Sequence, residues 1–357
     1  MLRRRLVLGL VVCAGAGLLA PGFGVPPAGA GGPTAQNVFT MSWLEGVVCR
    51  PDRTCLGAGD RVDGGAVGVL SAPGVVGPVR LISGTRSLDA ITCLPTGNCI
   101  AVGEGRRGSA ATVELRADGT PVAVHPVVGA THLYDVACPT ATTCLATGAQ
   151  VTRIPDYPYS STVPVFVVLT NGVPGPVQRY PRGPRRFIGI DCPTAARCLA
   201  VGGGAIAVFT NGGGSWTVAY RPPGPRYPGE DISCPSASSC YTTAVGGVQT
   251  PEGTLPVPAI LELSADGVPG VERMLSERSG SLHGISCVAE WTCTLVGGDN
   301  PSTQGLVIDV TPSGPPVVTI WENSNYFSDV SCVSATACGM VGTVGGTPPL
   351  PIFAWKG

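Results

Sequence analysis

The 357-residue sequence has few charged and few aromatic side chains. Charged residues make up 13% of the chain, the formal net charge is −1, and Lys356 is the only lysine. Over the whole chain, this balance implies neither the basic field that binds nucleic acid nor a field that attracts acidic substrates. Aromatic residues are only 6%, so few large apolar side chains are available to stabilise a core.

Sequence motifs of the common catalytic classes are also missing. No glycine-rich phosphate loop follows a strand and opens a helix, and we expect Gly202-Gly203-Gly204 to be a turn between strands. The only histidines are His125, His132 and His283. A Ser/His/Asp triad is an alternative to ordinary loop histidines, but no nucleophile-elbow sequence supports it. We therefore predict no enzyme, no cofactor and no metal.

The N-terminal apolar run is too short to span a membrane. It covers about 15 residues, follows Arg3, Arg4 and Arg5, and precedes an A-x-A cleavage signal ending at Ala30. The alternatives are an uncleaved anchor or a lipid on Cys13, and only these would bring the chain to a membrane. In either case the mature chain lies outside the cytoplasm, secreted or in the cell envelope. We predict a signal peptide, a flexible segment and one folded domain, over residues 1–30, 31–37 and 38–357.

The cysteines reveal a repeat. Of the 15 cysteines, 14 form seven pairs of C-x5-C spacing, with first cysteines 42 to 54 residues apart. A period of 40–50 residues with turn signals is typical of propeller blades. Gly and Pro, 52 and 35 residues, fit many short strands and turns. The sequence therefore predicts an all-β, seven-bladed propeller, which we expect to be a monomer.

Each unit predicts four strands. A β-branched residue stands two positions before every first cysteine, and Gly stands four positions after the second cysteine in six of seven units. Blade 2 shows strands at Leu88–Cys93, Cys99–Gly103, Ala110–Arg116 and Pro121–Val128. The last unit has only three strands. We expect Val38–Trp43 to pair with Pro351–Trp355 and to close the ring by a 3 + 1 arrangement, which removes a sheet edge.

Each cysteine pair is expected to form a disulfide that closes the hairpin between the first two strands of its blade. Each ring contributes about 2 kcal/mol by the loop-entropy estimate. Zinc is the alternative, but a zinc site needs four ligands and each pair stands alone on its blade. The predicted disulfides are Cys49–Cys55, Cys93–Cys99, Cys138–Cys144, Cys192–Cys198, Cys234–Cys240, Cys287–Cys293 and Cys332–Cys338.

One turn carries a family resemblance. Phe209–Trp216 resembles the Asp-box (BNR-type) turn T-D-G-G-x-T-W, with Thr210, Asn211, Gly213 and Trp216 at its marked positions. The chain is thus similar to secreted actinobacterial Asp-box propellers of the sialidase and photosystem II assembly-factor kind. The resemblance implies the propeller fold and a structural turn. The sialidase start motif is missing, so no catalytic residue is carried over.

Three aspartates, Asp135, Asp231 and Asp329, stand three residues before a first cysteine, on the strand expected innermost in its blade. Carboxylates grouped near a central channel could bind a cation. The alternative, which we favour, is that they cap turns or line a wet channel.

Functional residues are expected on the face opposite the cysteine hairpins, where loop length varies. The longer loops predicted there are Val151–Thr162, Arg179–Arg186, Tyr220–Glu230 and Gly247–Pro256. Arg and Tyr, which interfaces favour, gather in them: Arg106, Arg107, Arg153, Tyr157, Tyr159, Arg182, Arg185, Arg186, Arg221, Arg226 and Tyr227.

We therefore predict a non-catalytic binding or scaffold propeller that engages a protein or an envelope glycan through this face. Solvated loops whose arginines have no function are the alternative reading of the same residues. An envelope carbohydrate hydrolase or lyase, and an assembly or stability factor for an envelope complex, are the alternative functions.

Overall fold

The computed structural model contains 29 strands and no helix among the residues that it describes. These residues belong to one compact unit, Gly32–Gly357. No described helix is long and apolar enough to cross a membrane, and the expected signal peptide lies outside the described residues. The described ranges are 34–38, 40–72, 75–153, 160–180, 186–211, 216–221, 228–250, 253–300, 303–322, 324–345 and 349–357.

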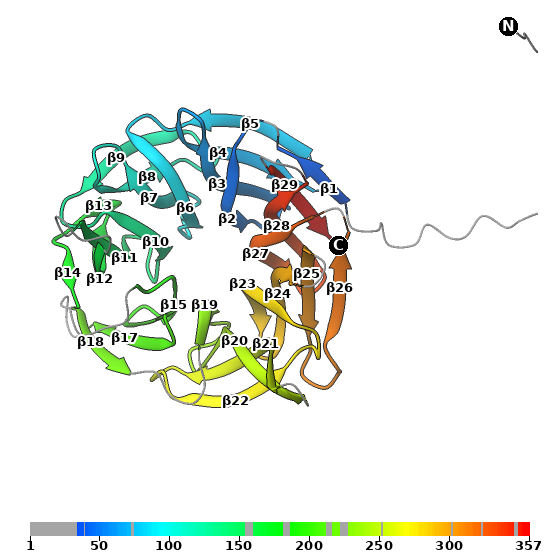
Figure 1. Cartoon of the computed structure of the whole chain (residues 1–357). Coiled ribbons are helices and arrows are strands. Elements are labelled where there is room, and N and C mark those ends of the chain that lie inside the picture. The colour runs from blue at the N-terminus through cyan, green and yellow to red at the C-terminus, as the bar shows by residue number, and fades with distance from the viewer. Residues whose placement is uncertain are drawn as a thin grey trace, which may run out of the picture. The chain divides into compact units, whose positions relative to one another are not determined.

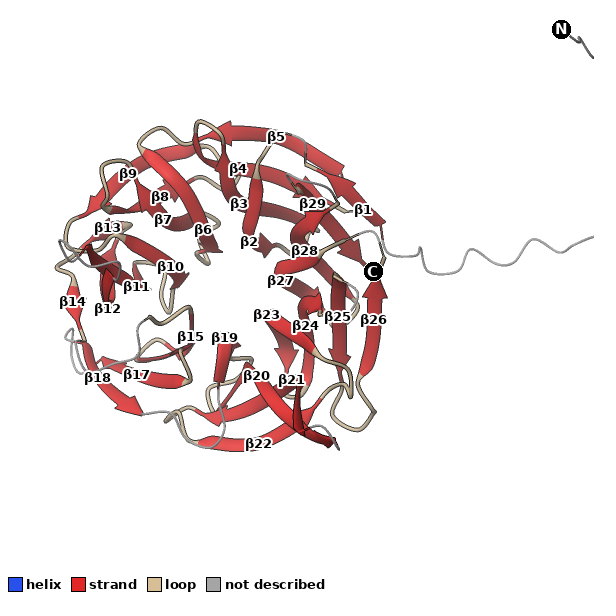
Figure 2. Cartoon of the chain, viewed as in Figure 1, coloured by secondary structure: helices blue, strands red, loops and turns tan. Residues whose placement is uncertain are grey.

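Seven antiparallel sheets form seven blades around a common axis (Figure 1), and strands joined by loops make up each blade (Figure 2). Blades 1 and 2 consist of β2 (Trp43–Cys49), β3 (Thr54–Arg61), β4 (Gly64–Ser71), β5 (Val75–Leu81), then β6 (Thr85–Cys93), β7 (Cys99–Gly105), β8 (Ala110–Leu115) and β9 (Pro121–Val127). Blades 3 and 4 consist of β10 (His132–Ala137), β11 (Thr143–Arg153), β12 (Ser160–Thr170), a divided outer strand of β13 (Val173–Pro174) and β14 (Gln178–Arg179), then β15 (Gly189–Thr194), β16 (Arg197–Gly202), β17 (Ala205–Asn211) and β18 (Trp216–Arg221).

Blades 5 and 6 consist of β19 (Pro228–Ser233), β20 (Ser239–Thr250), β21 (Gly253–Ser264), β22 (Pro269–Met274), then β23 (Gly280–Ala289), β24 (Thr292–Asp299), β25 (Gln304–Val310) and β26 (Val317–Trp321). Blade 7 consists of β27 (Tyr326–Ser334), β28 (Ala337–Val344), β29 (Leu350–Lys356) and β1 (Thr34–Asn37). The prediction of seven four-stranded blades is confirmed.

The ring closes by the 3 + 1 arrangement, but with a different strand from the one predicted. β1 pairs with β29, with Asn37 opposite Ile352. The prediction of Val38–Trp43 as the closing strand was wrong in position, because Val38 and Met41 are buried in the seam between blades 1 and 7 and Trp43 already begins β2. Val38 and Met41 are apolar because they are buried in the core. The residues that pair with β29 are those of β1, Thr34–Asn37, which come just before them.

The apolar core is divided among the seven seams between blades. Each buried cluster draws its side chains from two adjacent blades. The β-branched residue of each repeat belongs to one of these seams, and all seven are buried: Val47, Ile91, Val136, Ile190, Ile232, Ile285 and Val330. The repeat is therefore a packing requirement, since every blade must bury its inner strand against a neighbour.

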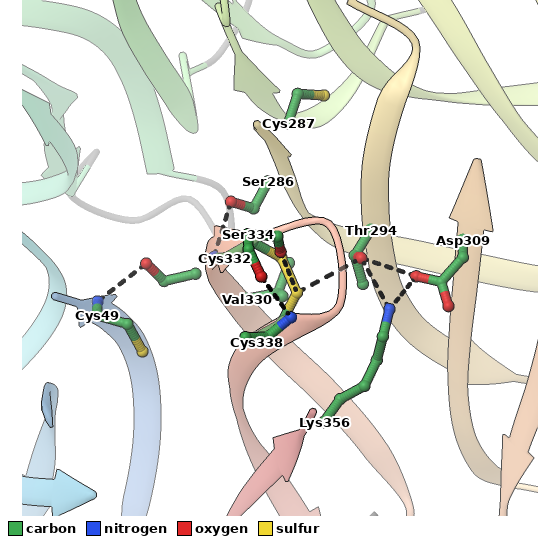
Figure 3. The surroundings of a disulfide bond; sticks show 12 residues. Cys49, Ser286, Cys287, Thr294, Asp309, Val330, Cys332, Ser334, Cys338 and Lys356 are labelled. Atoms are coloured by element: carbon green, nitrogen blue, oxygen red, sulfur yellow. Dashed lines mark hydrogen bonds and ion pairs between the residues drawn. A yellow bond between two sulfur atoms is a disulfide. The ribbon is translucent and has the colours of Figure 1, made fainter. Parts of the chain in front are cut away.

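All seven predicted disulfides are formed, each within one hairpin. Figure 3 shows the surroundings of the last one, Cys332–Cys338. Thr294 Oγ1, from blade 6, donates to Asp309 Oδ1 at 2.7 Å. The ammonium group of Lys356, on β29, lies 3.2 Å from Thr294 Oγ1 and pairs with Asp309. The single lysine thus connects blades 6 and 7.

Two of the predicted loops contain strand residues at both ends. β20 and β21 stay paired as far as Thr250 and Gly253, so most of Gly247–Pro256 forms a long hairpin. β11 and β12 likewise stay paired as far as Arg153 and Ser160. The loop prediction was wrong there because antiparallel pairing continues beyond the blade, which Gly and Pro in the sequence did not indicate.

Antiparallel order gives the ring two different faces. Turns between the second and third strands of a blade, such as residues 106–109, and the connections between blades emerge on one face, which we call the loop face. The disulfide hairpins and the turns before the outer strands, such as residues 116–120, emerge on the other, which we call the cystine face. The Asp-box-like hairpin belongs to the cystine face: Asn211 pairs with Trp216 between β17 and β18, and Gly213 lies outside the described residues.

Candidate functional site

The inner strands of five blades carry a β-bulge at one repeat position. The pairing skips one residue four positions before the first cysteine, for example between Leu44 and Gly46 on β2. A bulge leaves one residue without a ladder partner and turns its side chain in a new direction. The skipped residues are Glu45, Asp89, Tyr134, His283 and Ser328.

These bulge residues meet at the axis of the ring. A cavity of about 500 Å³ lies there, and we call it the channel mouth. Ile188 and Glu230 occupy the same repeat position in blades 4 and 5 and also line it. Its other polar or ionisable lining residues are Asp135, Asp231, Tyr326 and Asp329. Side chains 42 to 54 residues apart in the sequence are thus brought into one concave site.

In the five bulged blades the repeated Gly lies against the backbone next to the bulge. A Cβ at Gly297 would lie 1.9 Å from the backbone oxygen of Ser281, and one at Gly59 would lie 2.0 Å from that of Trp43. No side chain fits so close to backbone. In blade 5 this position is Ala244, and the pairing of β19 with β20 is shifted between Pro228 and Ile232 instead. The Gly repeat therefore belongs to the construction of the channel mouth.

The three aspartates singled out in the sequence tie neighbouring blades together. One carboxylate oxygen of Asp135 accepts the N–H of Val136, and the other accepts the N–H of Ile190 in blade 4, both at 2.7 Å. Asp231 does the same for Ile285 at 2.8 Å, and Asp329 for Val47 at 2.7 Å. Each of these aspartates therefore forms a hydrogen bond with the backbone of the inner strand of the next blade. Among the described residues, no group of three or more His, Cys, Asp or Glu side chains could hold a metal ion.

Burial perturbs the acids of the channel mouth. Burial, the largest cause, raises the pKa values of Asp135, Asp231 and Asp329, although each accepts two backbone N–H groups that act the other way. Burial, reinforced by the charges of Asp89 and Asp60, raises the pKa of Glu45 to about 7. At neutral pH the carboxyl groups of Glu45 and Asp329, whose pKa values are about 7, are therefore partly protonated.

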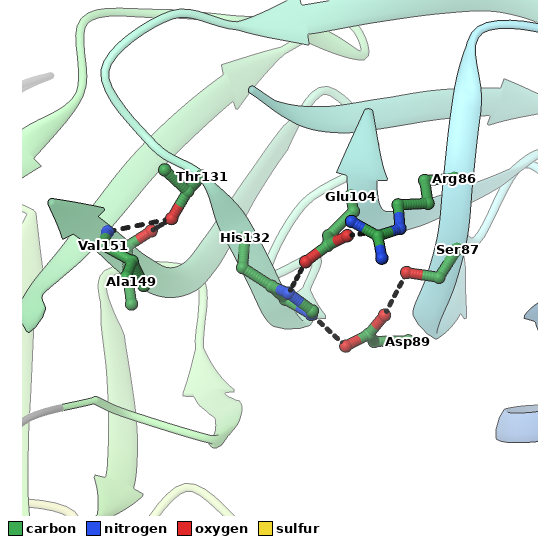
Figure 4. Close-up of polar contacts among 8 residues, drawn as sticks. All are labelled: Arg86, Ser87, Asp89, Glu104, Thr131, His132, Ala149 and Val151. Atoms are coloured by element: carbon green, nitrogen blue, oxygen red, sulfur yellow. Dashed lines mark hydrogen bonds and ion pairs between the residues drawn. The ribbon is translucent and has the colours of Figure 1, made fainter. Parts of the chain in front are cut away.

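His132 contacts Asp89, a residue that lines the channel mouth, as Figure 4 shows. Its Nε2 contacts Asp89, and its Nδ1 lies 3.0 Å from Glu104 Oε1. Glu104 also pairs with Arg86, with Nε 3.4 Å from Oε2. Burial alone would lower the pKa of His132, but the hydrogen bonds and charges of the two carboxylates raise it above its ordinary value. The His132 imidazole therefore connects blades 2 and 3 through the carboxylates of Asp89 and Glu104.

His283, in blade 6, lines the channel mouth. His283 Nδ1 lies 3.1 Å from Glu230 Oε2, and its Nε2 lies 3.2 Å from Ser281 Oγ. Its ring meets that of Tyr326 edge-on, with centroids 5.8 Å apart. The hydrogen bond from His283 is the largest cause of the lowered pKa of Glu230. His283 and Tyr326 also line a neighbouring cavity of about 570 Å³.

A further cavity of about 570 Å³ lies on the loop face between blades 1 and 2, and we call it the arginine groove. Its four arginines are Arg61, Arg86, Arg106 and Arg107. Glu104 also lines it, while its partner His132 contacts Asp89 of the channel mouth. His132 therefore contacts one lining residue of each cavity.

The structure places three of the predicted binding residues at these cavities. Arg106 and Arg107 line the arginine groove. The guanidinium carbon of Arg186 lies 5.7 Å from the ring centroid of Tyr134, a residue of the channel mouth. Arg153 and Arg221 lie at strand ends, and their side chains lie outside the description. The other predicted residues lie outside the described ranges: Tyr157, Tyr159, Arg182, Arg185, Arg226 and Tyr227.

The bulge residues were not predicted, although the sequence contains a signal for them. In five of seven repeats the residue four positions before the first cysteine is ionisable, and these are Glu45, Asp89, Tyr134, Glu230 and His283. Inspection of this position across the repeats would have indicated a ring of titratable groups. The position two residues later is β-branched in all seven repeats and is therefore the more conspicuous pattern.

Comparison with known proteins matches the architecture. The chain is similar to U3-55K at 9% identity, covering 93% of this chain and 100% of that one, with a TM-score of 0.61. It is similar to streptogramin B lyase at 10% identity, covering 90% and 97%, with a TM-score of 0.61. The fold is that of a seven-bladed β-propeller.

A third similar propeller is YCF48, solved bound to a D1 peptide, at 9% identity over 93% of this chain and 99% of that one, with a TM-score of 0.58. No protein-family model and no curated protein matches the sequence. Identities this low demonstrate a shared fold and leave function to the residues of this propeller's own sites.

Proposed function

We propose that the protein is a non-catalytic binding propeller that acts outside the cytoplasm and engages a protein or glycan partner through its loop face. One observation carries this proposal. The channel mouth, the arginine groove and the cavity beside His283 measure about 500–570 Å³ each, whereas the described cavity among the disulfide hairpins measures about 40 Å³. Binding sites are concave, so the loop face is the face that offers them.

Seven disulfides support the location. Disulfides persist in oxidising compartments and are rare in the cytosol, and here every blade has one. The proposed signal peptide, residues 1–30, agrees with export. The Asp-box resemblance of Thr210, Asn211 and Trp216 supports a secreted propeller of that type.

The propellers of similar fold support binding as one use of this architecture, since YCF48 was solved with a D1 peptide bound. A role as an assembly or stability factor for an envelope complex is one form of this proposal. Co-purification of a membrane complex with the protein would identify that form.

The test is a pull-down from an envelope extract with three full-length proteins. The wild type should retain one or more partners that the double variant Tyr134→Ala/Arg186→Glu loses, because both side chains lie at the channel mouth. Arg116→Glu, on the cystine face of blade 2, should retain them. The proposal fails if all three proteins retain the same partners in the same amounts.

A hydrolase or lyase acting on envelope carbohydrate is the second candidate, and one observation favours it. Glu45 has its pKa raised to about 7 beside Asp89 in a cavity of about 500 Å³, and an acid poised near neutral pH suits proton transfer. Streptogramin B lyase has a similar fold. Release of new sugar ends from envelope polysaccharide by the wild type, abolished in Glu45→Gln, would establish this candidate and refute the non-catalytic one.

A further inference from the structure

The arginine groove is lined by four arginines and by three carboxylates, those of Asp60, Asp63 and Glu104. Arg61 Nε pairs with Asp63 Oδ1 at 3.1 Å, and Arg86 Nε pairs with Glu104 Oε2 at 3.4 Å. Among the described residues, Arg106 and Arg107 have no carboxylate partner. Two guanidinium groups therefore line a cavity of about 570 Å³ without an ion-pair partner, although the carboxylate of Asp60 also lines it.

Backbone contacts fix Arg106 in place. Its Nη2 donates to the backbone oxygen of Asp63 in blade 1, and its Nε donates to that of Thr85 in blade 2 at 3.4 Å. A Cβ at Gly64 would lie 3.4 Å from this Nη2 and 2.8 Å from the Thr85 oxygen, so glycine leaves room for the guanidinium. Arg106 is therefore held at the seam before any ligand arrives, which lowers the entropy lost on binding.

Arg107 is exposed at the tip of the turn between β7 and β8. It has a φ of 75°, in the left-handed region that favours glycine, and Gly108 follows it with a φ of 76°. Its side chain forms no hydrogen bond or ion pair with the residues that the structure describes. A left-handed backbone conformation costs energy for a residue other than glycine, and no hydrogen bond or ion pair of the Arg107 side chain within the described part of the chain compensates for it. Such conformations cluster at ligand-binding sites.

The lining of the groove favours a polar ligand. It contains no aromatic side chain, and its single aliphatic side chain, Val62, is fully exposed. Energetically important contacts between proteins usually involve aromatic or other large side chains in well-packed pockets. Guanidinium groups, in contrast, bind carboxylates through paired charge-assisted hydrogen bonds. Asp63 and Glu104 can also accept hydrogen bonds from hydroxyl groups.

We propose that the arginine groove binds a carboxylated polysaccharide, with Arg106 and Arg107 holding its carboxylate groups. This rests on the proposed function, since it names the chemistry of one partner of the loop face. The size of the groove is within the range of about 300–1,000 Å³ of ligand pockets.

The test measures the retardation of the full-length protein in native gels that contain polygalacturonate, neutral dextran or polyglutamate. Polygalacturonate should retard the wild type and dextran should not. Arg107→Glu should weaken the apparent affinity for polygalacturonate about tenfold or more, the size expected for a lost charge-assisted hydrogen bond. Arg116→Glu changes the net charge equally on the opposite face and should bind as the wild type does.

Arg107→Gly separates binding from folding. Glycine accepts the left-handed φ without strain, so this variant should unfold at the wild-type temperature or above and should still bind weakly. The proposal is overturned if polygalacturonate does not retard the wild type, if Arg107→Gly binds normally, or if Arg116→Glu weakens binding as much as Arg107→Glu. Retardation by polyglutamate alone would also overturn it and would indicate an acidic protein partner.

This result can be separated from that of the pull-down. If the groove variants have no effect while Tyr134→Ala/Arg186→Glu still loses its partners, the loop face binds elsewhere and only the groove assignment fails. If neither set has an effect, the proposed function fails as well.

Discussion

Asp329 Oδ2 accepts the backbone N–H of Val47 at 2.7 Å, across 282 residues of sequence. This bond connects the inner strand of blade 7 to that of blade 1, while β1 and β29 close the outer part of blade 7. Ser331 Oγ accepts the N–H of Cys49 at 2.9 Å two residues further along. The ring is therefore closed at its axis as well as at its rim.

Removal of the Asp329 carboxylate should destabilise the protein. Asp329→Ala leaves two backbone N–H groups, those of Val47 and Val330, without their acceptor. A buried donor without a partner costs about 1–3 kcal/mol, and we expect a loss of this size in the free energy of unfolding by guanidinium. Asp266→Asn removes an exposed carboxylate paired with Arg197 and should cost about 1 kcal/mol or less. Equal losses for the two variants would contradict the structural role of Asp329.

Stability should fall as the pH rises from about 4 to about 8. A carboxyl group with a raised pKa keeps its proton in the folded state at pH values where the unfolded chain has released it. This contribution is complete below the ordinary value near 4. It is lost as the pH passes the folded values, about 7 for Glu45 and Asp329 and about 8 for Asp135. The raised pKa of His132 acts in the same direction.

Thermal unfolding between pH 4.5 and 8.5 measures this effect. The midpoint should be highest at the acid end, and Glu45→Gln should reduce the slope because it removes one titrating group without changing the shape of the side chain. A midpoint that rises steadily with pH would show that these carboxyl groups are not buried as described.

Substitution of a repeat glycine should be severe. In Gly297→Ala the new Cβ would lie 1.9 Å from the Ser281 backbone oxygen, so β23 must move away from β24. Overpacking of this kind costs about 1–3 kcal/mol and occasionally more. Gly68→Ala is the matched control, since its nearest contact would be at 3.5 Å, and its unfolding midpoint in guanidinium should stay close to the wild-type value. Comparable midpoints for both variants would refute the close approach.

The carboxylates around His132 should repel each other once the imidazole is removed. His132→Ala leaves Asp89 and Glu104 without their shared hydrogen-bond partner, and we expect a loss of about 1–3 kcal/mol. His125→Ala removes a histidine with a single partner, Glu114 at 2.7 Å, and should cost less. Adding Glu104→Gln to His132→Ala should recover part of the loss, because one of the two charges is gone. A double-mutant cycle on unfolding free energies measures the coupling, and additive losses would contradict it.

The sequence determined the number of blades, the disulfides and the strand order, because these depend on spacings that recur within 40–55 residues. Each C-x5-C pair of this chain closes a hairpin within its own blade, and Val47 and Ile285 follow a β-branched repeat that is visible in the sequence. Closure of the ring followed from counting strands. The position of the closing strand did not, because the apolar residues Val38 and Met41 fill a seam.

The tertiary structure alone decided which side chains share a site. Glu45, Tyr134 and His283 come from three blades, and they meet only because the ring closes and bulges turn them toward the axis. The interblade role of Asp329 likewise depends on a strand 282 residues away. Such contacts depend on the direction of a side chain at a bulge and on the angle between blades. Both are set by packing over the whole ring, and a local sequence pattern does not contain them.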